Sequence, residues 1–395
     1  MRLGCSLGWC SGRAASSLSN SPLSYEINYQ FSNEFIDSHQ EQISLLNLSL
    51  LKAQECRAQT ARRNRLNVDR YLSHLRSVFC NKRRSIIPIG SSVNGLNGKN
   101  SDLDLVRFGS PYRFYINFDS QLRKQMNAVA GILINAKLLD PASLQQVPVL
   151  KFRNRDGIMV DLQFNNVGTI RSSLFVRTCV QFSFIVPVVV HWINSFFDAI
   201  KLKNSRHGLF STYHLNMLAL HFLQSSSFEF LPDIISSCSM LRPCAPWEDV
   251  AEILTAKGKM LVISDNHKYY KISPAEVIIK MIDYYSQLDL NNISIDICGK
   301  TYKRIADNAE DTFIQLIDPY FPEDTSPHAR CTLIMVCKSI ARRLAANSKT
   351  TIMELKERRG STTFFENVKA RHSKRLDALE RKLEGSDKEG CPASN

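Results

Sequence analysis

Two aspartates, Asp102 and Asp104, lie two residues apart at the start of the apolar segment 103–108. Because side chains alternate along a β-strand, both carboxylates are expected on the same face of a strand formed there. Adjacent carboxylates repel each other unless a hard cation such as Mg²⁺ binds between their oxygens. Taken alone, such a pair is also typical of a solvated strand edge, so a second signal is needed before it predicts a metal site.

The second signal is the dipeptide Gly90-Ser91, which directly follows the apolar residues 86–89. A strand that runs into a tight turn and then into a helix presents backbone N–H groups and a hydroxyl to a phosphate. A Gly-Ser dipeptide by itself means little. A phosphate-binding turn followed by a polar loop and two strand-borne carboxylates favours nucleotide chemistry assisted by a metal ion.

Residues 90–108 as a whole resemble the nucleotidyltransferase signature of the DNA-polymerase-β superfamily. In that signature the Gly-Ser turn holds the triphosphate, and two Asp together with a third carboxylate on a neighbouring strand bind two metal ions. Asp161 supplies the third carboxylate, because it lies among apolar residues in a strand-like segment. The resemblance implies that Asp102, Asp104 and Asp161 are the catalytic ligands of Mg²⁺ or Mn²⁺. It also implies that Gly90 and Ser91 contact the triphosphate.

Four further segments resemble one branch of this superfamily, the cytoplasmic terminal nucleotidyltransferases, and within it the poly(A) polymerases of the germline-development type. They occur in the order that the family shows, and they are Phe164–Ser173, Gly208–Tyr213, Ser273–Tyr285 and Asp318–Arg330. The resemblance implies that Asn166 and Ser173 contact the ribose and phosphates of the nucleotide. It also implies that Thr212 contacts the triphosphate and that Tyr213 stacks on the base.

One departure from the family concerns the helix around Trp192. Relatives carry a Lys before this Trp and another after it, and both reach the triphosphate, whereas residues 188–194 contain no Lys. Lys201 is the predicted substitute, and Lys203 lies close enough along the chain to be an alternative. Without such a cation, loss of a charge-assisted contact is expected to weaken nucleotide binding about ten- to a hundred-fold.

The composition of the chain indicates its class and its kind of partner. A length of 395 residues is sufficient for two domains, and a net charge of +13 favours a polyanionic partner such as RNA, DNA or an anionic membrane. The eleven cysteines form no C-x-x-C pair, which predicts free thiols in a reducing compartment. Residues 178–197 carry no charged side chain, and polar residues interrupt them. We predict a buried segment there and no membrane contact.

The pattern of apolar residues predicts an α+β protein. We expect a small mixed α/β nucleotidyltransferase domain and a mostly helical central domain that carries a poly(A)-polymerase-associated segment. The N-terminal helices are expected to pack on the helical domain, as the resemblance implies. The predicted boundaries are 1–25 disordered, 26–80 N-terminal helices, 81–172 nucleotidyltransferase domain, 173–350 helical domain and 351–395 a basic helical or disordered tail.

The resemblance implies template-independent addition of AMP from ATP to RNA 3′ ends, in poly(A) tail extension of mRNA. Two alternatives remain open at this point: the same chemistry with UTP, and a catalytically silent scaffold, which the missing lysines favour. In relatives, a residue in the turn that follows the position of Pro319 helps to select the base. Counting back from Arg330 identifies this residue as Ser326, and not as His328. A Ser there favours ATP.

The sequence contains no recognisable RNA-binding module, so an RNA-binding protein partner is expected to supply substrate choice. The expected location is the cytoplasm. The acid-free, Ser-rich residues 1–25 resemble a weak mitochondrial presequence, which makes the mitochondrion the minor alternative. A nuclear location is not excluded.

Overall fold

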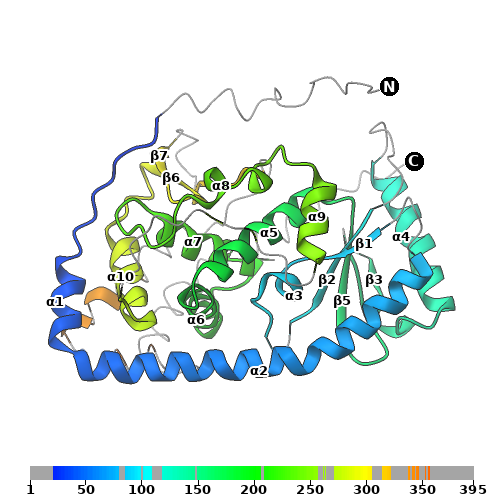
Figure 1. Cartoon of the computed structure of the whole chain (residues 1–395), viewed down its shortest axis with the longest axis horizontal. Helices are drawn as coiled ribbons and strands as arrows, with labels where there is room; N and C mark the ends of the chain where they lie inside the picture. Colours follow the sequence, from blue (N-terminus) through cyan, green and yellow to red (C-terminus); the bar gives the residue numbers. More distant parts are fainter. Residues whose placement is uncertain are drawn as a thin grey trace, which may run out of the picture. The chain divides into compact units, whose positions relative to one another are not determined.

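The computed structural model describes two compact units of the chain (Figure 1). We call them the sheet unit, Leu51–Val188 with Leu231–His267, and the helix-rich unit, Met1–Leu50 with Val189–Phe230 and Lys268–Asn395. Within them the described residues are 21–79, 85–98, 101–108, 118–146, 149–205, 209–256, 261, 263, 271–304, 314–321, 337–338, 340–342, 344–346, 352 and 355. The predicted basic tail beyond residue 355 lies outside this set, as do residues 1–20.

The sheet unit is built on five strands in the order β1-β2-β5-β4-β3. The central pair, β2 and β5, runs parallel, and every other neighbouring pair is antiparallel. The strands are β1 (Ser85–Pro88), β2 (Leu103–Phe108), β3 (Gln145–Gln146), β4 (Leu150–Arg153) and β5 (Met159–Phe164). Since β2 lies in the middle of the sheet, Leu105 and Val106 are both buried although they point to opposite faces.

Helices cover this sheet and give it a hydrophobic core. The core joins the strands to α2 (Gln40–Phe79) and α4 (Phe118–Asn135), through side chains that include Leu75 and Leu133. The short helix α3 (Ser91–Asn94) and helix α9 (Trp247–Thr255) pack on α5 (Val167–Phe182). The remaining short helices of the unit are η1 (Pro141–Ser143), α8 (Ile234–Ser237) and η3 (Ser239–Leu241).

Helix α2 belongs to both units, which differs from the expectation that all of residues 26–80 pack on the helical domain. Its first part buries Ile43 and Leu46 in the helix-rich unit, and its last part buries Tyr71 and Leu75 in the core of the sheet unit. No side chain between these two parts is buried, from residue 51 to residue 70. The helix is therefore divided between the two units, because its buried apolar residues lie near its two ends and face different cores.

A second difference from the predicted boundaries is that residues 231–267 group with the sheet unit. The Arg171 guanidinium donates to the Ala245 carbonyl at 2.7 Å, and that of Arg177 donates to the Leu254 carbonyl at 2.8 Å. Both arginines lie on α5, so these bonds attach the later segment to the sheet unit. Sequence periodicity carries no information about such long-range contacts.

The helix-rich unit contains the predicted poly(A)-polymerase-associated helix, which is α10 (Pro274–Gln287). Its N-terminus is fixed by a capping box, in which Ser273 and Glu276 satisfy each other's backbone N–H groups. Tyr284 and Tyr285 are buried, and the Tyr285 hydroxyl donates to the Leu218 carbonyl on α7 at 2.7 Å. The other described elements are α1 (Gln30–Ser38), α6 (Ile185–Ala199), α7 (Thr212–Gln224), β6 (Ile293–Asp296), β7 (Thr301–Lys303) and β8 (Leu316–Ile317).

Part of the segment for which we expected disorder is paired. Leu23 forms an isolated antiparallel bridge with Thr301 at the edge of the three-stranded sheet β7-β6-β8. The backbone N–H of Leu23 donates to the Thr301 carbonyl at 2.7 Å, and the Thr301 hydroxyl donates back to the Leu23 carbonyl at 3.0 Å. The predicted boundary at residue 25 therefore lies inside a hydrogen-bonded segment.

The uncharged stretch 178–197 is not one helix, because α5 ends at Phe182 and α6 begins at Ile185. No single helix of the described chain is long and apolar enough to cross a membrane. Among the described helices, α5 and α6 are long and apolar enough only when the two are counted together, and the chain bends sharply between them. Half of the side chains of α5 and most of those of α6 are buried, as expected for the buried segment that the sequence predicted.

Helix α2 offers a direct test of the core of the sheet unit. Leu75 is 1% exposed and Leu66, on the same helix, is 73% exposed. We expect Leu75→Ala to lower the free energy of unfolding by about 2–5 kcal/mol, because it leaves a cavity between α2 and the sheet. Leu66→Ala is expected to change it by less than about 0.5 kcal/mol. Urea unfolding followed by circular dichroism measures both, and equal effects would contradict this packing.

Candidate active site

The register of the two parallel strands brings two of the predicted metal ligands together. Asp104 on β2 is the direct partner of Asp161 on β5, with both side chains partly buried. Asp102 precedes β2 by one residue and is exposed. The structure thus pairs Asp104 with Asp161 on the central strands and places Asp102 one residue before β2.

The Gly90 turn lies directly over Asp104. Gly90 has a φ of +60°, a left-handed conformation that favours glycine. A Cβ atom built there would lie 2.6 Å from the Asp104 Oδ2 atom, so any side chain at this position would displace the carboxylate. The turn opens α3, whose first residue is Ser91. Gly90 is therefore required both by its backbone angle and by its closeness to Asp104.

Two of the three carboxyl groups, Asp102 and Asp104, have raised pKa values. Burial, followed by the charges of Asp161 and Asp102, raises the pKa of Asp104 from 3.8 to about 7. Burial, followed by the charge of Asp161, also raises the pKa of Asp102. In both cases the ammonium of Lys151 acts in the opposite direction. The site therefore holds more negative charge than its surroundings neutralise.

Lys151 is a site residue that sequence reasoning missed. It lies on β4 directly opposite Asp161, and its ammonium forms an ion pair with the Asp161 Oδ2 atom. The available signal was a single Lys within the apolar segment Val147–Phe152. A charged residue in such a segment needs a partner when the strand is buried. Strand pairing identifies Asp161 as that partner.

Asp102, Asp104 and Asp161 have the chemical groups that bind a divalent cation. All three are carboxylates, the ligands that Mg²⁺ and Mn²⁺ prefer. The Oδ1 atom of Asp161 is buried and has no hydrogen-bond partner, which leaves one ligand atom available. The side chains are not gathered, since no group of three or more His, Cys, Asp or Glu within the described ranges is close enough to hold a metal. In this structure Lys151 supplies the positive charge at Asp161.

Ser173 and Asn166, the predicted contacts to ribose and phosphates, both have structural partners. The Gly90 N–H donates to the Ser173 hydroxyl at 2.8 Å, and that hydroxyl donates to the Thr169 carbonyl at 2.5 Å. Ser173 is buried. The Asn166 side chain caps α5 by accepting from the Thr169 N–H at 3.2 Å. Both residues position the Gly90 turn and α5 in this structure, and a contact to nucleotide stays a prediction.

The remaining predicted nucleotide contacts belong to the helix-rich unit. Thr212 is the exposed first residue of α7, where Ser211 caps the helix. The Tyr213 hydroxyl donates to the Asp318 carboxylate at 2.6 Å, which fixes the tyrosine ring. Lys201 follows α6 with an exposed side chain and a left-handed backbone, φ +62°. The predicted positions Gly208, Ser326, His328 and Arg330 lie outside the described residues.

Comparison with known proteins adds evidence to this geometry. Residues 44–181 match the family model of the central palm domain of mitochondrial-like poly(A) RNA polymerase. The chain is 27% identical over 212 residues to human poly(A) RNA polymerase GLD2, a match covering 51% of this chain and 40% of that protein. Zebrafish (Danio rerio) poly(A) RNA polymerase GLD2 is 29% identical over 154 residues, covering 38% and 30%. The predicted resemblance to the poly(A) polymerases is thereby confirmed.

Solved structures show the same fold. The structure of a GLD-2/RNP-8 complex superimposes with a TM-score of 0.63 at 17% identity, covering 80% of this chain and 98% of that chain. A complex of mtPAP with ATPγS gives 0.58 at 16% identity, covering 86% and 76%. The predicted α+β nucleotidyltransferase fold is confirmed. Since the chain spans less than half the length of the curated poly(A) polymerases that it matches, its activity is treated below as a proposal.

The raised pKa of Asp104 predicts how stability depends on pH in the absence of metal. As the pH rises from 3.8 to about 7, the unfolded chain loses the Asp104 proton while the folded chain keeps it, so the folded state is progressively destabilised. The full cost is present above the folded pKa. We therefore expect Asp104→Asn to raise the unfolding midpoint by a few degrees at about pH 8, and to leave it near the wild-type value at about pH 4.

Thermal unfolding in EDTA measures this difference, and added Mg²⁺ should stabilise the wild type more than the Asn variant. Asp249→Asn, on the exposed first turn of α9, provides a control for removal of one carboxylate. An Asp104→Asn midpoint that equals the wild type at both pH values would contradict the charge balance described for this site.

Proposed function

We propose that this protein adds AMP from ATP to RNA 3′ ends without a template. The observation that carries the proposal is the pairing of Asp104 with Asp161 beneath the Gly90 turn. It occurs in a chain whose residues 44–181 match the palm domain of poly(A) RNA polymerase. Paired strand carboxylates and a phosphate-binding turn are the parts that metal-assisted nucleotidyl transfer requires.

The reaction joins the RNA 3′-oxygen to the α-phosphorus of ATP, and the bond from that phosphorus to pyrophosphate breaks. Divalent cations bound by Asp102, Asp104 and Asp161 would neutralise negative charge on the reacting phosphates. The Gly90 turn would hold the triphosphate through the Ser91 N–H and hydroxyl. This hydroxyl has no hydrogen-bond partner among the described residues, so it is available for a phosphate oxygen.

Lys151 would hold the Asp161 carboxylate in place during this reaction. Its ammonium lies against one carboxylate oxygen and leaves the buried second oxygen available as a ligand. Within the helix-rich unit, the hydroxyl of Tyr213 is held by Asp318, which fixes its aromatic ring. A ring fixed in this way is well suited to stack on a base, although such stacking does not distinguish adenine from uracil.

A catalytically silent scaffold is the second candidate, and the absence of Lys from α6 favours it. The side-chain amide of Asn194 on this helix donates to the Asn216 side chain on α7 at 2.8 Å. This amide is therefore already hydrogen-bonded within the protein. Lys201 and Lys203 are the nearest cations after the helix. Lys203 is half-buried, and this burial lowers its pKa. Either lysine would have to supply the charge that relatives place within the helix.

We also propose that a separate RNA-binding protein selects the RNA substrate in the cytoplasm. Two of the solved structures with this fold are complexes of GLD-2 with a second protein, RNP-8 in one and GLD-3 in the other. The present chain carries a high positive charge but no recognisable RNA-binding module. Its own contacts to RNA are therefore expected to be to phosphates and to have little sequence preference.

The metal site gives the first test of this function. We expect Asp104→Ala to reduce tailing of an oligo(A) primer to the background rate, because the remaining carboxylates cannot hold the metal in place. The assay contains purified protein, Mg²⁺ and ATP, and extension is read on a denaturing gel. Asp249→Ala is the control. Tails of wild-type length from a correctly folded Asp104→Ala protein would exclude the mechanism, whereas an inactive wild type would favour the scaffold.

The choice of nucleotide gives a second test. Structures of a cytoplasmic RNA terminal U-transferase share this fold, with a TM-score of 0.57 at 15% identity, so the fold does not decide between ATP and UTP. Because Ser326 cannot replace the His that contributes to uracil selection in relatives, we expect a higher kcat/KM for ATP on one RNA primer. A preference for UTP that disappears in His328→Ala would show that His328 is the selecting residue.

A further inference from the structure

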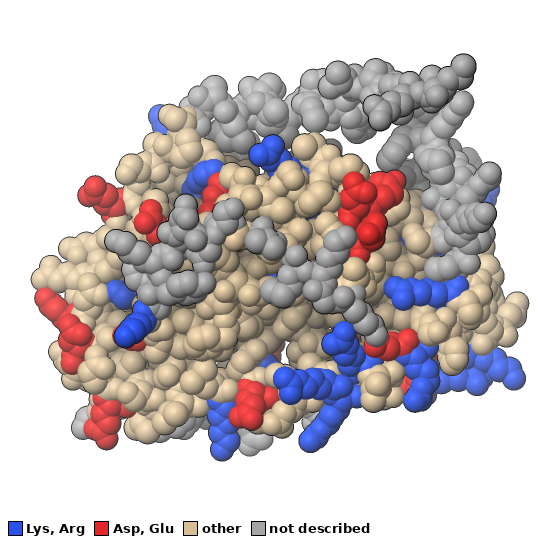
Figure 2. Space-filling model, in the orientation of Figure 1, with Lys and Arg blue, Asp and Glu red and all other residues tan. Residues whose placement is uncertain are grey.

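Helix α2 carries an arginine-rich segment that the proposed chemistry does not use. Residues 57–76 contain six arginines and a single acid, Asp69. Figure 2 shows Lys and Arg side chains gathered over this part of α2. The arginines of the segment with exposed side chains are Arg62, Arg63, Arg65, Arg70 and Arg76. Such a density of cations on one short stretch gives this surface a positive potential that attracts polyanions.

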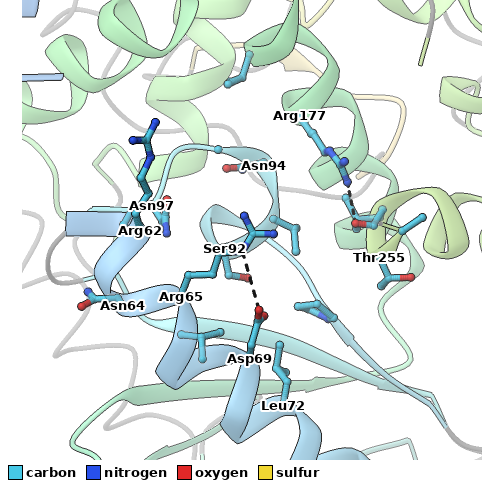
Figure 3. Close-up of a pocket in the computed structure, with 18 of the residues that line it drawn as sticks. Arg62, Asn64, Arg65, Asp69, Leu72, Ser92, Asn94, Asn97, Arg177 and Thr255 are labelled. Carbon is cyan, nitrogen blue, oxygen red and sulfur yellow. Dashed lines mark hydrogen bonds and ion pairs between the residues drawn. The ribbon is translucent and has the colours of Figure 1, made fainter. Parts of the chain in front are cut away.

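A groove lies along one side of this segment. A cavity of about 500 Å³ is lined by α2, by the Ser92–Gly95 turn and by α5 and α9 (Figure 3). A second cavity, of about 440 Å³, shares Asn64, Val68, Ser92 and Asn97 with the first. Asp102 lines this second cavity. The two cavities therefore form one groove in the sheet unit that runs along α2 and includes a predicted metal ligand, Asp102, in its lining.

The arginines of α2 divide into two sets with respect to this groove. Arg62, Arg65 and Arg76 line it, and Figure 3 shows Arg62 and Arg65 leaving α2 toward the side where Ser92 and Asn97 lie. Arg63 and Arg70 are exposed but line neither cavity. Arg65 makes an ion pair of 4.0 Å with Asp69, and both side chains are substantially exposed. A pair this exposed contributes little, so a phosphate is able to replace the carboxylate.

The polar groups of the groove suit a sugar-phosphate backbone. Guanidinium groups bind phosphates through two parallel hydrogen bonds, and Asn and Ser side chains serve ribose hydroxyls and phosphate oxygens. Asn64, Asn97 and Ser92 supply such groups between the two arginines and Asp102. The Arg177 guanidinium is held by α9 carbonyls at the far side of the groove, so its charge is fixed there.

We propose that this groove binds the RNA backbone upstream of the 3′ end, with Arg62 and Arg65 as phosphate contacts. The inference rests on the proposed function for the identity of the polyanion, because RNA is the substrate whose end must reach the carboxylates. A groove that reaches Asp102 from α2 would hold the nucleotides before the 3′ end beside this helix. Contacts to phosphates carry no base information, which agrees with tailing of many sequences.

The test compares two double variants that remove the same charge from opposite sides of α2. Arg62→Gln/Arg65→Gln changes the groove, and Arg63→Gln/Arg70→Gln is the matched control. Binding of a fluorescent oligo(A) to the full chain is followed by anisotropy at increasing salt, in EDTA so that no extension occurs. If two phosphate contacts are lost, the slope of log K against log salt becomes shallower by about 1.4, and affinity near 0.15 M salt falls roughly ten-fold.

The control pair should keep the wild-type slope, and both pairs should keep the wild-type unfolding midpoint because all four side chains are exposed. Equal slopes in the two pairs would overturn the groove and leave only diffuse electrostatic binding. Poly-glutamate is the second probe. If the groove pair loses poly-glutamate binding while oligo(A) binding is unchanged, the groove takes an acidic protein partner and the proposal fails.

Failure of the groove and failure of the proposed function give different results. An active protein whose KM for oligo(A) is the same in both pairs would exclude the groove and leave the reaction in place. An inactive protein whose oligo(A) binding weakens only in the Arg62→Gln/Arg65→Gln pair would exclude the reaction and leave the RNA groove. The expected result is an active enzyme in which the Arg62→Gln/Arg65→Gln variant has a raised KM for oligo(A) and the Arg63→Gln/Arg70→Gln control does not.

Discussion

The repulsion between Asp104 and Asp161 is the constraint on which the rest of the sheet unit depends. These carboxylates are direct partners on parallel strands, and burial together with the charges of Asp161 and Asp102 raises the pKa of Asp104. A protein tolerates such a pair only when surrounding structure holds both strands in register. The cores beneath β2 and β5 supply that rigidity, and the Lys151 ammonium supplies part of the missing charge. The same unbalanced charge is what makes the pair suitable for binding cations.

Several residues that the resemblance assigns to the nucleotide also hold the scaffold together. Ser173 connects α5 to the Gly90 N–H, and Asn166 caps the same helix. Tyr213 is joined to the Asp318 turn in the helix-rich unit. Hydrogen bonds of this kind preorganise a site, since side chains already held in place lose little freedom when a ligand binds. Structural and nucleotide-binding roles are therefore compatible for these residues.

The division of α2 between two units explains where its charged residues lie. Apolar residues near its start and its end are buried in different cores, and the part between them carries the arginines. A helical segment with no core to face is free to carry charge, because its side chains remain solvated. In this chain that segment borders the groove whose lining includes Asp102.

The sequence by itself determined the local features of this protein. Strand alternation predicted Asp102 and Asp104 side by side, the Gly-Ser dipeptide predicted a tight turn, and resemblance to the poly(A)-polymerase-associated segment predicted α10. These features depend only on residues close in the chain. The pairing of Lys151 with Asp161, the bond from Gly90 to Ser173 and the division of α2 at Leu50 were decided by tertiary structure. Each of them requires strand register or a contact between distant segments, and a local pattern is compatible with many such arrangements.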